Sequence, residues 1–500
     1  MQQKLKQLKA ILAEVSHLNK TINVLSWDQQ VYMPPGGAES RSEQLKTLQR
    51  IKHERFTSEE TGKLLQELKP YTAKLDPDSD DARIIMMVSR RYEKKKKVPS
   101  EFVGEFGRVT AIAYQVWTQA RAENNFSLFR PHLEKIVNMN RQYASFFAPY
   151  DHVYDPLLDE YEPGMKTAEV QAIFAPLRTQ QVELIKAISD KTQVGDSFLY
   201  QDFDETRQWD FGVHVITQIG YNWEQGRQDK TVHPFTTDLG YGDIRITTRV
   251  DPKLFNSAFF STVHECGHAL YDQGIPKHLS DVCLNEELSL GIHESQSRMW
   301  ENLLGRSLPF WRYFYPKLQK TFPAQLGKVK LEDFYKGINK VQPSFIRTEA
   351  DEATYNLHIM LRLEIEIGLM EGSLQVKDLP EVWNDRMRAY LGITPPNDAE
   401  GVLQDVHWSD GYLGYFPTYA LGNLVAVQLW EKIKQDIPDL EDQITLGEFS
   451  TLLGWLREKI HKHSAKYFPQ ELLQRITGSK IDSAPYIRYL GNKFGQIYNL

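Results

Sequence analysis

The feature that most constrains the fold is a helical spacing of apolar residues that recurs along most of the chain. The first stripe consists of Leu5, Leu8, Leu12 and Val15, which are spaced by three or four residues and therefore share one face of a helix. Similar stripes lie within residues 64–68, 357–365 and 421–429. The spacing predicts a mainly α fold.

Proline and glycine residues break these stripes at short intervals, at 34–37, 163–164 and 395–396. A chain of 500 residues would by its length alone suggest two or three domains. The sequence shows no fixed-period repeat and no low-complexity linker. We therefore expect one large helical domain over residues 1–500, built of two lobes.

The charge of the chain gives no reason to expect a nucleic acid or an anionic membrane as a partner. The formal net charge is −7, so no basic field surrounds the molecule as a whole. One run, Lys94 to Lys97, is strongly basic. It is typical of the solvated end of a helix, where cations suit the helix dipole. The alternative is a nuclear address or a phosphate-binding patch.

Cysteine usage and the N-terminus point to the cytoplasm. Two cysteines, Cys266 and Cys283, are too few for a disulfide scaffold in a chain of this length. The first fifteen residues carry scattered charges and lack the apolar segment of a signal peptide. No stretch approaches about 18 apolar residues without a charge, so we expect no membrane span.

Residues 243–250 depart from the helical pattern, because polar and β-branched residues alternate there. This period of two predicts a strand, and therefore a short sheet immediately before the motif described next. An exposed strand in that place can pair with an extended peptide by adding to the edge of the sheet. The alternative is a small structural hairpin.

His264, Glu265 and His268 form an H-E-x-x-H motif within an apolar segment. Residues at i and i+4 share a helix face, so the two imidazoles can point at one metal ion. Glu265 is rotated by about 100° and can reach a water molecule without being a ligand. Gly267 weakens a helix relative to alanine, which indicates a packing or access requirement. The alternative is two histidines packed in a helical core.

Cys266 lies within the motif but faces away from the histidine pair. It is either a redox-active or metal-binding thiol or a small buried apolar residue.

A catalytic site of this kind needs a third protein ligand and an open position. Residues 288–303 have the apolar face of a second helix, and Glu294 lies within it. His293 is a rival ligand, but adjacent residues do not share a helix face, so only one of the two can point at the ion. Spacing alone does not decide between Glu294, Glu286 and Glu287.

Further segments, together with HECGH and HESQSR, carry a resemblance to peptidase family M32, the Taq-type thermostable metallocarboxypeptidases. They are Trp27-Asp28-Gln29 with Met33-Pro34, His233-Pro234-Phe235, residues 243–248, residues 346–352 (IRTEADE) and residues 401–408 (GVLQDVHW). The segments at 346–352 and 401–408 are the more specific, and together the matches span nearly the whole chain.

This resemblance implies a helical fold with a deep groove, similar to neurolysin and the angiotensin-converting enzymes. It implies that single amino acids are removed from the free C-terminus of peptides with broad specificity, and that the enzyme is a homodimer. It implies Zn²⁺ or Co²⁺ held by His264, His268 and Glu294, with Glu265 as the general base. The alternative is a metallo-oligopeptidase or endopeptidase on the same fold.

His407 and Tyr415, with Tyr419 behind them, are candidate donors to the oxyanion of the reaction, because related helical metallopeptidases use a histidine and a tyrosine in this way. The alternative for each is a buried aromatic ring with one satisfied polar tip.

An exopeptidase must also recognise a free carboxylate, which the arginine fork binds through two hydrogen bonds. Arg347 is the first candidate, and the alternative is a structural ion pair with an acidic residue of the same segment. Arg245 and Arg249 are weaker candidates. His233 either lines the substrate pocket or begins a proline turn. The acidic residues that compete for Arg347 are Glu349, Asp351 and Glu352.

Overall fold

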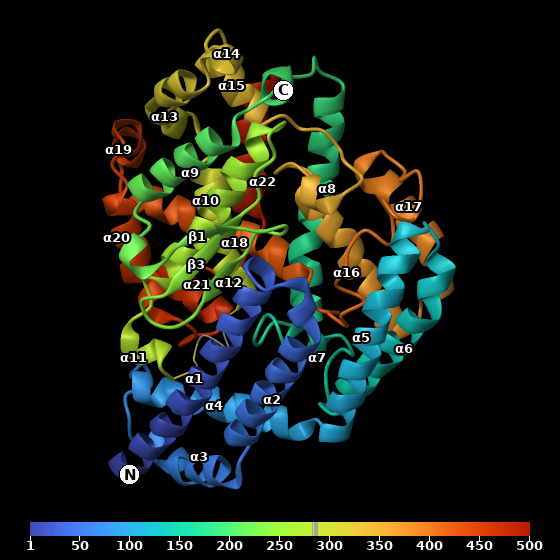
Figure 1. Ribbon diagram of the computed structural model, residues 1–500, viewed down its shortest axis with the longest axis vertical. Coiled ribbons are helices and arrows are strands. Elements are labelled where there is room, and N and C mark those ends of the chain that lie inside the picture. The colour runs from blue at the N-terminus through green and yellow to red at the C-terminus, as the bar shows by residue number, and fades with distance from the viewer. Residues whose placement is uncertain (283, 285–288) are drawn as a thin grey trace.

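The computed structural model describes residues 1–282, 284 and 289–500 (Figure 1). The fold is mainly helical with one small sheet, as the apolar spacing predicts. The described residues do not include four positions that carry predictions, namely Cys283, Glu286, Glu287 and Leu288.

The first half of the described chain contains α1 (Gln2–Val31), α2 (Ala38–Phe56), α3 (Glu59–Thr72), α4 (Asp80–Lys97), α5 (Ser100–Ala122), α6 (Phe126–Ser145), α7 (Asp155–Leu158), α8 (Thr167–Ser189), α9 (Glu205–Ile219), β1 (Gln228–Lys230), β2 (Thr236–Asp238) and β3 (Ile244–Thr248). The second half contains α10 (Phe255–Asp272), α11 (Lys277–Ser280), α12 (Leu290–Arg298), α13 (Leu308–Thr321), α14 (Pro323–Leu326), α15 (Leu331–Ile338), α16 (Tyr355–Glu371), α17 (Leu379–Leu391), α18 (Pro417–Asp436), α19 (Leu440–Leu446), α20 (Ser450–Lys459), α21 (Pro469–Thr477) and α22 (Ala484–Tyr498).

The predicted stripes form the core. All four residues of the first stripe on α1 are buried, and so are those on α3, α16 and α18. The buried apolar side chains join into one continuous cluster that runs from α1 to α22. Burial of these stripes, rather than helix propensity, stabilises most of the helices. Among the described residues, no helix combines the length and apolar composition needed to cross a bilayer.

The basic run ends α4, as the simpler interpretation predicts. The Ser79 hydroxyl caps the other end of this helix by accepting a hydrogen bond from the Ala82 amide at 3.3 Å. Lys94 forms ion pairs with Asp159 at 2.8 Å and Glu160 at 3.0 Å. Its charge is therefore used within the protein and is not free to bind a phosphate.

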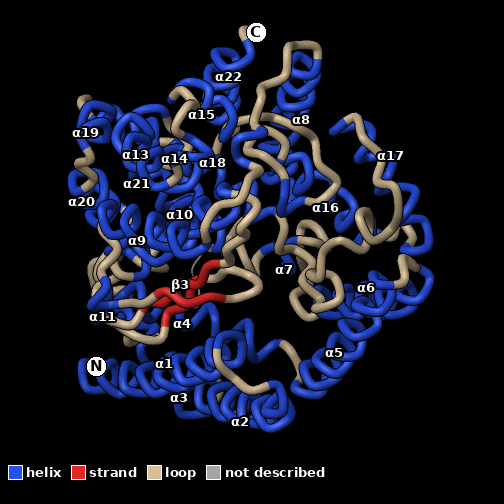
Figure 2. The backbone as a smooth tube through the Cα atoms, turned by 45° about the horizontal axis from the view of Figure 1, so that its top comes forward, coloured by secondary structure: helices blue, strands red, loops and turns tan. Residues whose placement is uncertain are grey.

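The predicted strand is the central strand of a three-stranded sheet with the order β1-β3-β2. β3 pairs in parallel with β1 and antiparallel with β2, where Ile246 lies opposite Thr236. Because both edges of β3 are occupied, a peptide cannot add to this strand, and the edges of the sheet belong to β1 and β2. Figure 2 shows the sheet between α1–α3 and the helices around α10.

Three helices meet beside the sheet and form the floor of the candidate site. α10 packs against β2 and β3, α12 packs against α10, and α18 packs against the other side of α12. Two glycines allow this close packing. A Cβ atom at Gly267 of α10 would lie 2.7 Å from the Ser297 Cα atom, and one at Gly422 of α18 would lie 2.7 Å from Glu294 Cγ. The sequence indicates a packing or access requirement at Gly267, and the structure shows that this requirement is the close approach of α12.

Candidate metal centre

α10 presents His264 and His268 from one face. The opposite face of this helix is apolar, and Phe255, Phe259 and Val263 are buried in the core. The HECGH segment therefore forms helix because its apolar residues cover the core and its polar residues converge on the other side.

α12 supplies the third group, Glu294, and its N-terminus is tightly capped. The Ser289 hydroxyl accepts a hydrogen bond from the Ile292 amide at 3.0 Å and donates one to Glu162 Oε2 at 2.6 Å. Glu162 Oε1 also accepts a hydrogen bond from the Gly291 amide at 2.5 Å. Burial raises the pKa of Glu162 to about 7, although these hydrogen bonds oppose the shift. A carboxyl group from residues distant in sequence thus holds the first turn of α12.

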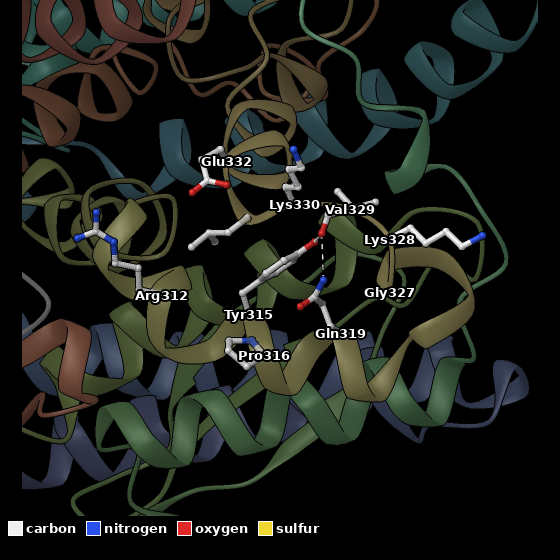
Figure 3. Close-up of a pocket in the computed structure, with 10 residues that line it drawn as sticks. Arg312, Tyr315, Pro316, Gln319, Gly327, Lys328, Val329, Lys330 and Glu332 are labelled. Atoms are coloured by element: carbon white, nitrogen blue, oxygen red, sulfur yellow. Dashed lines mark hydrogen bonds between the residues drawn. The ribbon is translucent and has the colours of Figure 1, made fainter.

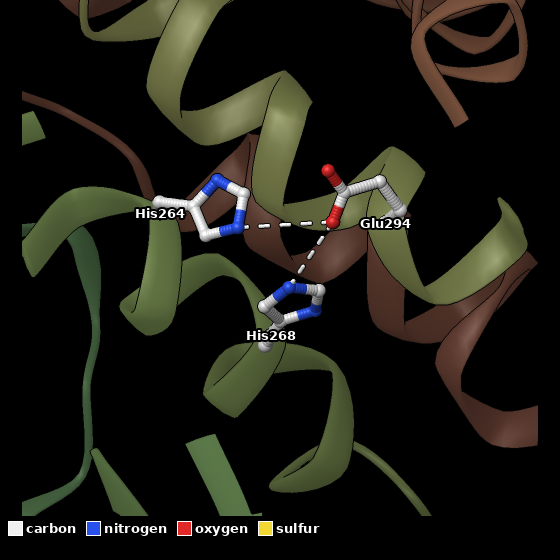
Figure 4. Close-up of side chains that lie close together, drawn as sticks. All are labelled: His264, His268 and Glu294. Carbon is white, nitrogen blue, oxygen red and sulfur yellow. Dashed lines mark ion pairs between the residues drawn. The ribbon is translucent and has the colours of Figure 1, made fainter. Parts of the chain in front are cut away.

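The donor atoms of His264, His268 and Glu294 face one another (Figure 4). Glu294 Oε2 lies 3.7 Å from His264 Nε2 and 3.4 Å from His268 Nε2. The three donor atoms all lie within 4.8 Å of one another. Two ligand atoms of a tetrahedral zinc ion lie about 3.4 Å apart when its bonds measure about 2.0–2.1 Å. The spacing and the donor set therefore fit an ion of the zinc type.

The protonation states of His268 and Glu294 also suit a metal. Burial, reinforced by the nearby His293, lowers the pKa of His268 to about 4, so its imidazole is neutral at pH 7. Burial alone would raise the pKa of Glu294, but the charges of Arg298 and His264 outweigh it and hold that pKa well below the usual range. A neutral imidazole and an ionised carboxylate are the forms that bind metal.

A set of charged groups orients these candidate ligands. Glu301 Oε2 lies 2.8 Å from His264 Nδ1, which leaves the Nε2 atom of that ring facing Glu294. Arg298 donates to Glu294 Oε1 at 2.6 Å and to Glu301 Oε2 at 3.1 Å. Glu301 lies in a π-helix, Met299–Leu304, that continues α12. Carboxylates that hold the second nitrogen of a ligating histidine fix its tautomer and ring orientation.

Glu265 lies on α10 beside His264, and its side chain is buried. Its carboxylate Oε2 accepts a hydrogen bond from the Thr236 hydroxyl of β2 at 2.7 Å. Burial raises the pKa of Glu265, while the charge of His264 and the Thr236 hydrogen bond oppose that rise.

The competing interpretations of the neighbouring residues are resolved by their surroundings. The His293 ring stacks on His268 with centroids 4.3 Å apart, and its Nε2 lies 3.3 Å from Asp272 Oδ1, so it is turned away from the three donor atoms. Cys266 is fully buried, and burial raises the pKa of its thiol well above the usual value. Cys266 therefore packs as a small apolar residue.

The predicted oxyanion donors lie together just before and at the start of α18. His407 Nε2 lies 3.4 Å from the Tyr419 hydroxyl, and the rings of His407 and Tyr415 have centroids 5.3 Å apart. Burial lowers the pKa of His407 to about 4, so the ring is neutral. Burial and the charge of Glu294 raise the pKa of Tyr415 and Tyr419, so both hydroxyl groups keep their protons.

Arg347 is paired, but not with the acidic residues of its own segment. Its Nη2 donates to Asp405 Oδ1 at 2.9 Å, and its Nη1 donates to the Tyr355 hydroxyl at 2.9 Å. The Tyr355 ring also lies under Arg298, whose Cζ is 4.6 Å from the ring centroid. Tyr355 thus links Arg347 to the arginine that holds Glu294, and Asp405 connects the 346–352 segment with the 401–408 segment.

Arg245 and His233, two of the other predicted substrate residues, have different surroundings. Arg245, on β3, forms two hydrogen bonds of 2.8 Å with Asp243, and its Cζ lies 4.3 Å from the centroid of the Trp27 ring. Its fork is therefore engaged within the protein. His233 is exposed in the segment that leads into β2.

A cavity of about 460 Å³ lies near α13, lined in part by Arg312, Tyr315, Lys330 and Glu332 (Figure 3). None of its lining residues belongs to the metal centre, and its charged groups have both signs.

Sequence reasoning did not identify Thr236, Glu301, Arg298 or Glu162. Thr236 directly follows the His233-Pro234-Phe235 segment, and Glu301 lies seven residues after Glu294 on the continuation of the same helix. These positions were the available signals, but neither shows by itself which side chain a residue contacts.

Comparison with known proteins identifies relatives along the whole chain. The family model described as Carboxypeptidase Taq (M32) metallopeptidase matches residues 7–494. Carboxypeptidase 1 of Bacillus subtilis is 38% identical over 496 residues, covering 99% of each chain. Thermostable carboxypeptidase 1 of Thermus thermophilus is 39% identical over 495 residues, covering 97% of each. The crystal structure of an M32 carboxypeptidase from Deinococcus radiodurans R1 superposes with a TM-score of 0.96 at 38% identity, covering 100% of both chains.

Proposed function

The chain belongs to the Carboxypeptidase Taq (M32) metallopeptidase family, and from this premise we propose that it removes single amino acids from the free C-terminus of peptides with broad specificity. It is a metallocarboxypeptidase with a candidate site at His264, His268 and Glu294.

The observation that carries the proposal is the convergence of two imidazole nitrogens from α10 and one carboxylate oxygen from α12. A separate carboxylate, that of Glu265, lies on α10 beside them. His264, His268 and Glu294 would hold Zn²⁺ or Co²⁺. Such an ion, when bound, supplies Lewis acidity toward water and toward a peptide carbonyl group. Glu265 is not one of the three converging groups, which leaves its carboxylate available for proton transfer.

In this proposal Glu265 accepts a proton from the attacking water and later passes a proton to the leaving amine. Its buried position supports this role, because a carboxylate with a raised pKa is closer to the proton affinity that a general base needs. His407 and Tyr415 donate hydrogen bonds to the oxyanion that develops on the peptide carbonyl. Their neutral, protonated forms suit donation.

Arg347 is the proposed receptor for the C-terminal carboxylate of the substrate. A guanidinium group has five N–H donors, and the Asp405 and Tyr355 contacts leave some of them free. The ion pair with Asp405 also holds the guanidinium in one orientation, which favours capture of a carboxylate in a fixed geometry.

The deciding experiment compares an unmodified peptide with its C-terminally amidated twin, each incubated with metal-loaded protein and analysed by mass spectrometry. We expect residues to leave one at a time from the free C-terminus only. Glu265→Gln should lower the rate of cleavage by a factor of about 10² to 10⁴, and the variant protein should still bind the metal. Internal cleavage of both peptides would instead identify an endopeptidase on the same fold.

The homodimer and the identity of the metal are further parts of the proposal. Light scattering coupled to size-exclusion chromatography should give twice the mass of the 58.0 kDa chain. Metal content measured after purification, and activity restored to the metal-free protein by Zn²⁺ or Co²⁺, test the choice of ion.

A further inference from the structure

β2 places one hydroxyl group directly against the carboxylate of Glu265. The Thr236 Oγ1 atom lies 2.7 Å from Glu265 Oε2 and 2.9 Å from the Glu265 backbone oxygen. Within the described part of the chain, no other hydrogen bond reaches this carboxylate. A buried glutamate side chain with three rotatable bonds therefore depends on one hydroxyl group for its orientation.

Both contacts of Thr236 fall on Glu265, one on its side chain and one on its backbone. A threonine hydroxyl has one hydrogen to donate, and the carboxylate oxygen lies nearer to Oγ1 than the backbone oxygen does. The position of β2 therefore sets where this carboxylate oxygen lies.

We infer that Thr236 is the positioning residue of Glu265, and that its hydroxyl group holds the carboxylate in one orientation. The inference rests on the proposed function, in which Glu265 is the general base. Thr236 does not touch the metal ligands in this account, so its effect should fall on the chemical step and not on metal binding.

The strand that carries Thr236 is itself firmly held. Thr236 lies opposite Ile246 in the antiparallel pairing of β2 with β3. Beside it, the Phe235 amide donates to the Thr247 hydroxyl at 2.8 Å, and the Thr247 amide donates to the Phe235 carbonyl at 2.9 Å.

The other end of β2 is held by the N-terminal helix. Asp238 forms an ion pair with Lys20 of α1, and the Asn23 side chain donates to the Asp238 carbonyl at 2.9 Å. The sheet and α1 thus fix both ends of β2, so that the Thr236 hydroxyl is presented to Glu265 from a rigid support.

The test replaces the hydroxyl and leaves the shape. Thr236→Val removes the hydroxyl group from a side chain of nearly equal volume, and Thr236→Ser keeps the hydroxyl. Thr237→Val makes the same chemical change at the next residue of β2, whose side chain points to the other face of the sheet. Each full-length variant is measured for kcat, KM, thermal unfolding and the dissociation constant of Zn²⁺ by competition with a chelator.

We expect Thr236→Val to lower kcat by about 10- to 100-fold, since a small misplacement of a catalytic group has an effect of this size. KM and the Zn²⁺ dissociation constant should stay within about twofold of the parent values, because the groups that bind metal and substrate are unchanged. Thr236→Ser should recover kcat to within about threefold, and Thr237→Val should match the parent protein. In a Glu265→Gln background, Thr236→Val should have no further effect on kcat.

The Glu265→Gln variant distinguishes failure of the positioning role from failure of the proposed function. If that variant is inactive while Thr236→Val keeps the parent kcat, the positioning role is wrong and the proposed function stands. If Glu265→Gln remains fully active, the proposed function itself fails. Should Thr236→Val not fold, Thr236→Ala and Thr236→Ser decide the matter, because a folded serine variant with the low kcat of the alanine variant would overturn the inference.

Discussion

Replacing Gly267 with alanine should damage the metal centre although the change adds only one methyl group. In an exposed helix the same substitution stabilises by about 1 kcal/mol, because alanine has the higher helix propensity. At Gly267 the new Cβ would lie 2.7 Å from Ser297 Cα and 2.8 Å from the Gln296 carbonyl oxygen, both backbone atoms of α12. Backbone atoms cannot rotate away, so the two helices must separate.

The required displacement is large compared with the tolerance of a metal site. Ordinary van der Waals contact begins at 3.4 Å, so a shift of about 0.7 Å restores it from the 2.7 Å contact. Metal–ligand distances hold within about 0.2 Å of their preferred values. α12 cannot yield freely, because Gly422 of α18 packs against Glu294 on its other side. The helix that carries Glu294 is therefore pressed between α10 and α18.

We expect Gly267→Ala to weaken Zn²⁺ binding by about 10- to 100-fold and to lower kcat/KM by at least about tenfold. Overpacking of this kind costs about 1–3 kcal/mol, which should exceed the propensity gain and lower the Tm. Gly422→Ala should act in the same direction, since its Cβ would meet the Glu294 side chain at 2.7 Å.

Gly454→Ala is the matched control, because Gly454 lies exposed within α20 and a Cβ there would meet nothing within 4 Å. Its Tm should hold or rise, with unchanged metal binding. Chelator competition, steady-state kinetics on a free peptide and thermal unfolding are measured for all three variants. A Gly267→Ala protein that folds and binds Zn²⁺ within about threefold of the parent would refute the reasoning, because the closeness of the helices would then not set the geometry of the site.

Two further changes test the charges around the site and at a distance from it. Glu301→Gln removes the carboxylate that holds His264 Nδ1. Zn²⁺ binding, measured by competition with a chelator, should weaken by about 10- to 100-fold. An affinity within about threefold of the parent would contradict this role. Burial alone would raise the pKa of Glu160, but the charges of Lys94 and Lys95 lower it to about 2, so this group contributes stability above pH 4.5 that is lost as the pH falls toward 2. Glu160→Gln should therefore lower the free energy of unfolding, measured by urea titration at pH 7, by an amount on the order of 3 kcal/mol at most. This difference from the parent should shrink as the pH falls from 4.5 toward 2. An equal difference at pH 7 and at low pH would contradict the assignment.

The helical part of the fold and the histidine pair were predictable because both depend on local geometry. An apolar residue at every third or fourth position lies on one face of a helix wherever the chain runs, and the stripe from Leu5 to Val15 is buried accordingly. His264 and His268 share a face for the same reason. The strand at 243–250 was also recognisable from its period of two, and β3 lies within it.

Predictions that depended on the packing of two segments were less secure. Spacing left Glu294, Glu286 and Glu287 open as the third ligand, and the crossing of α12 over α10 is what brings Glu294 to the histidines. The idea that the predicted strand offers a free edge fails because β1 and β2 occupy both sides of it. The alternative for Arg347 was a structural ion pair with an acidic residue of its own segment. Arg347 does form an ion pair, but its partner is Asp405, which lies 58 residues away.

By itself, the sequence determined a helical chain, a pair of histidines on one helix face and a carboxylate beside them, since each follows from the regular geometry of a single helix. Only the tertiary structure decided which groups complete and hold the site. Thr236 reaches Glu265 across 29 residues of chain, and Glu301 reaches His264 across 37. Such contacts depend on how the intervening elements pack, and no spacing within one element encodes that distance.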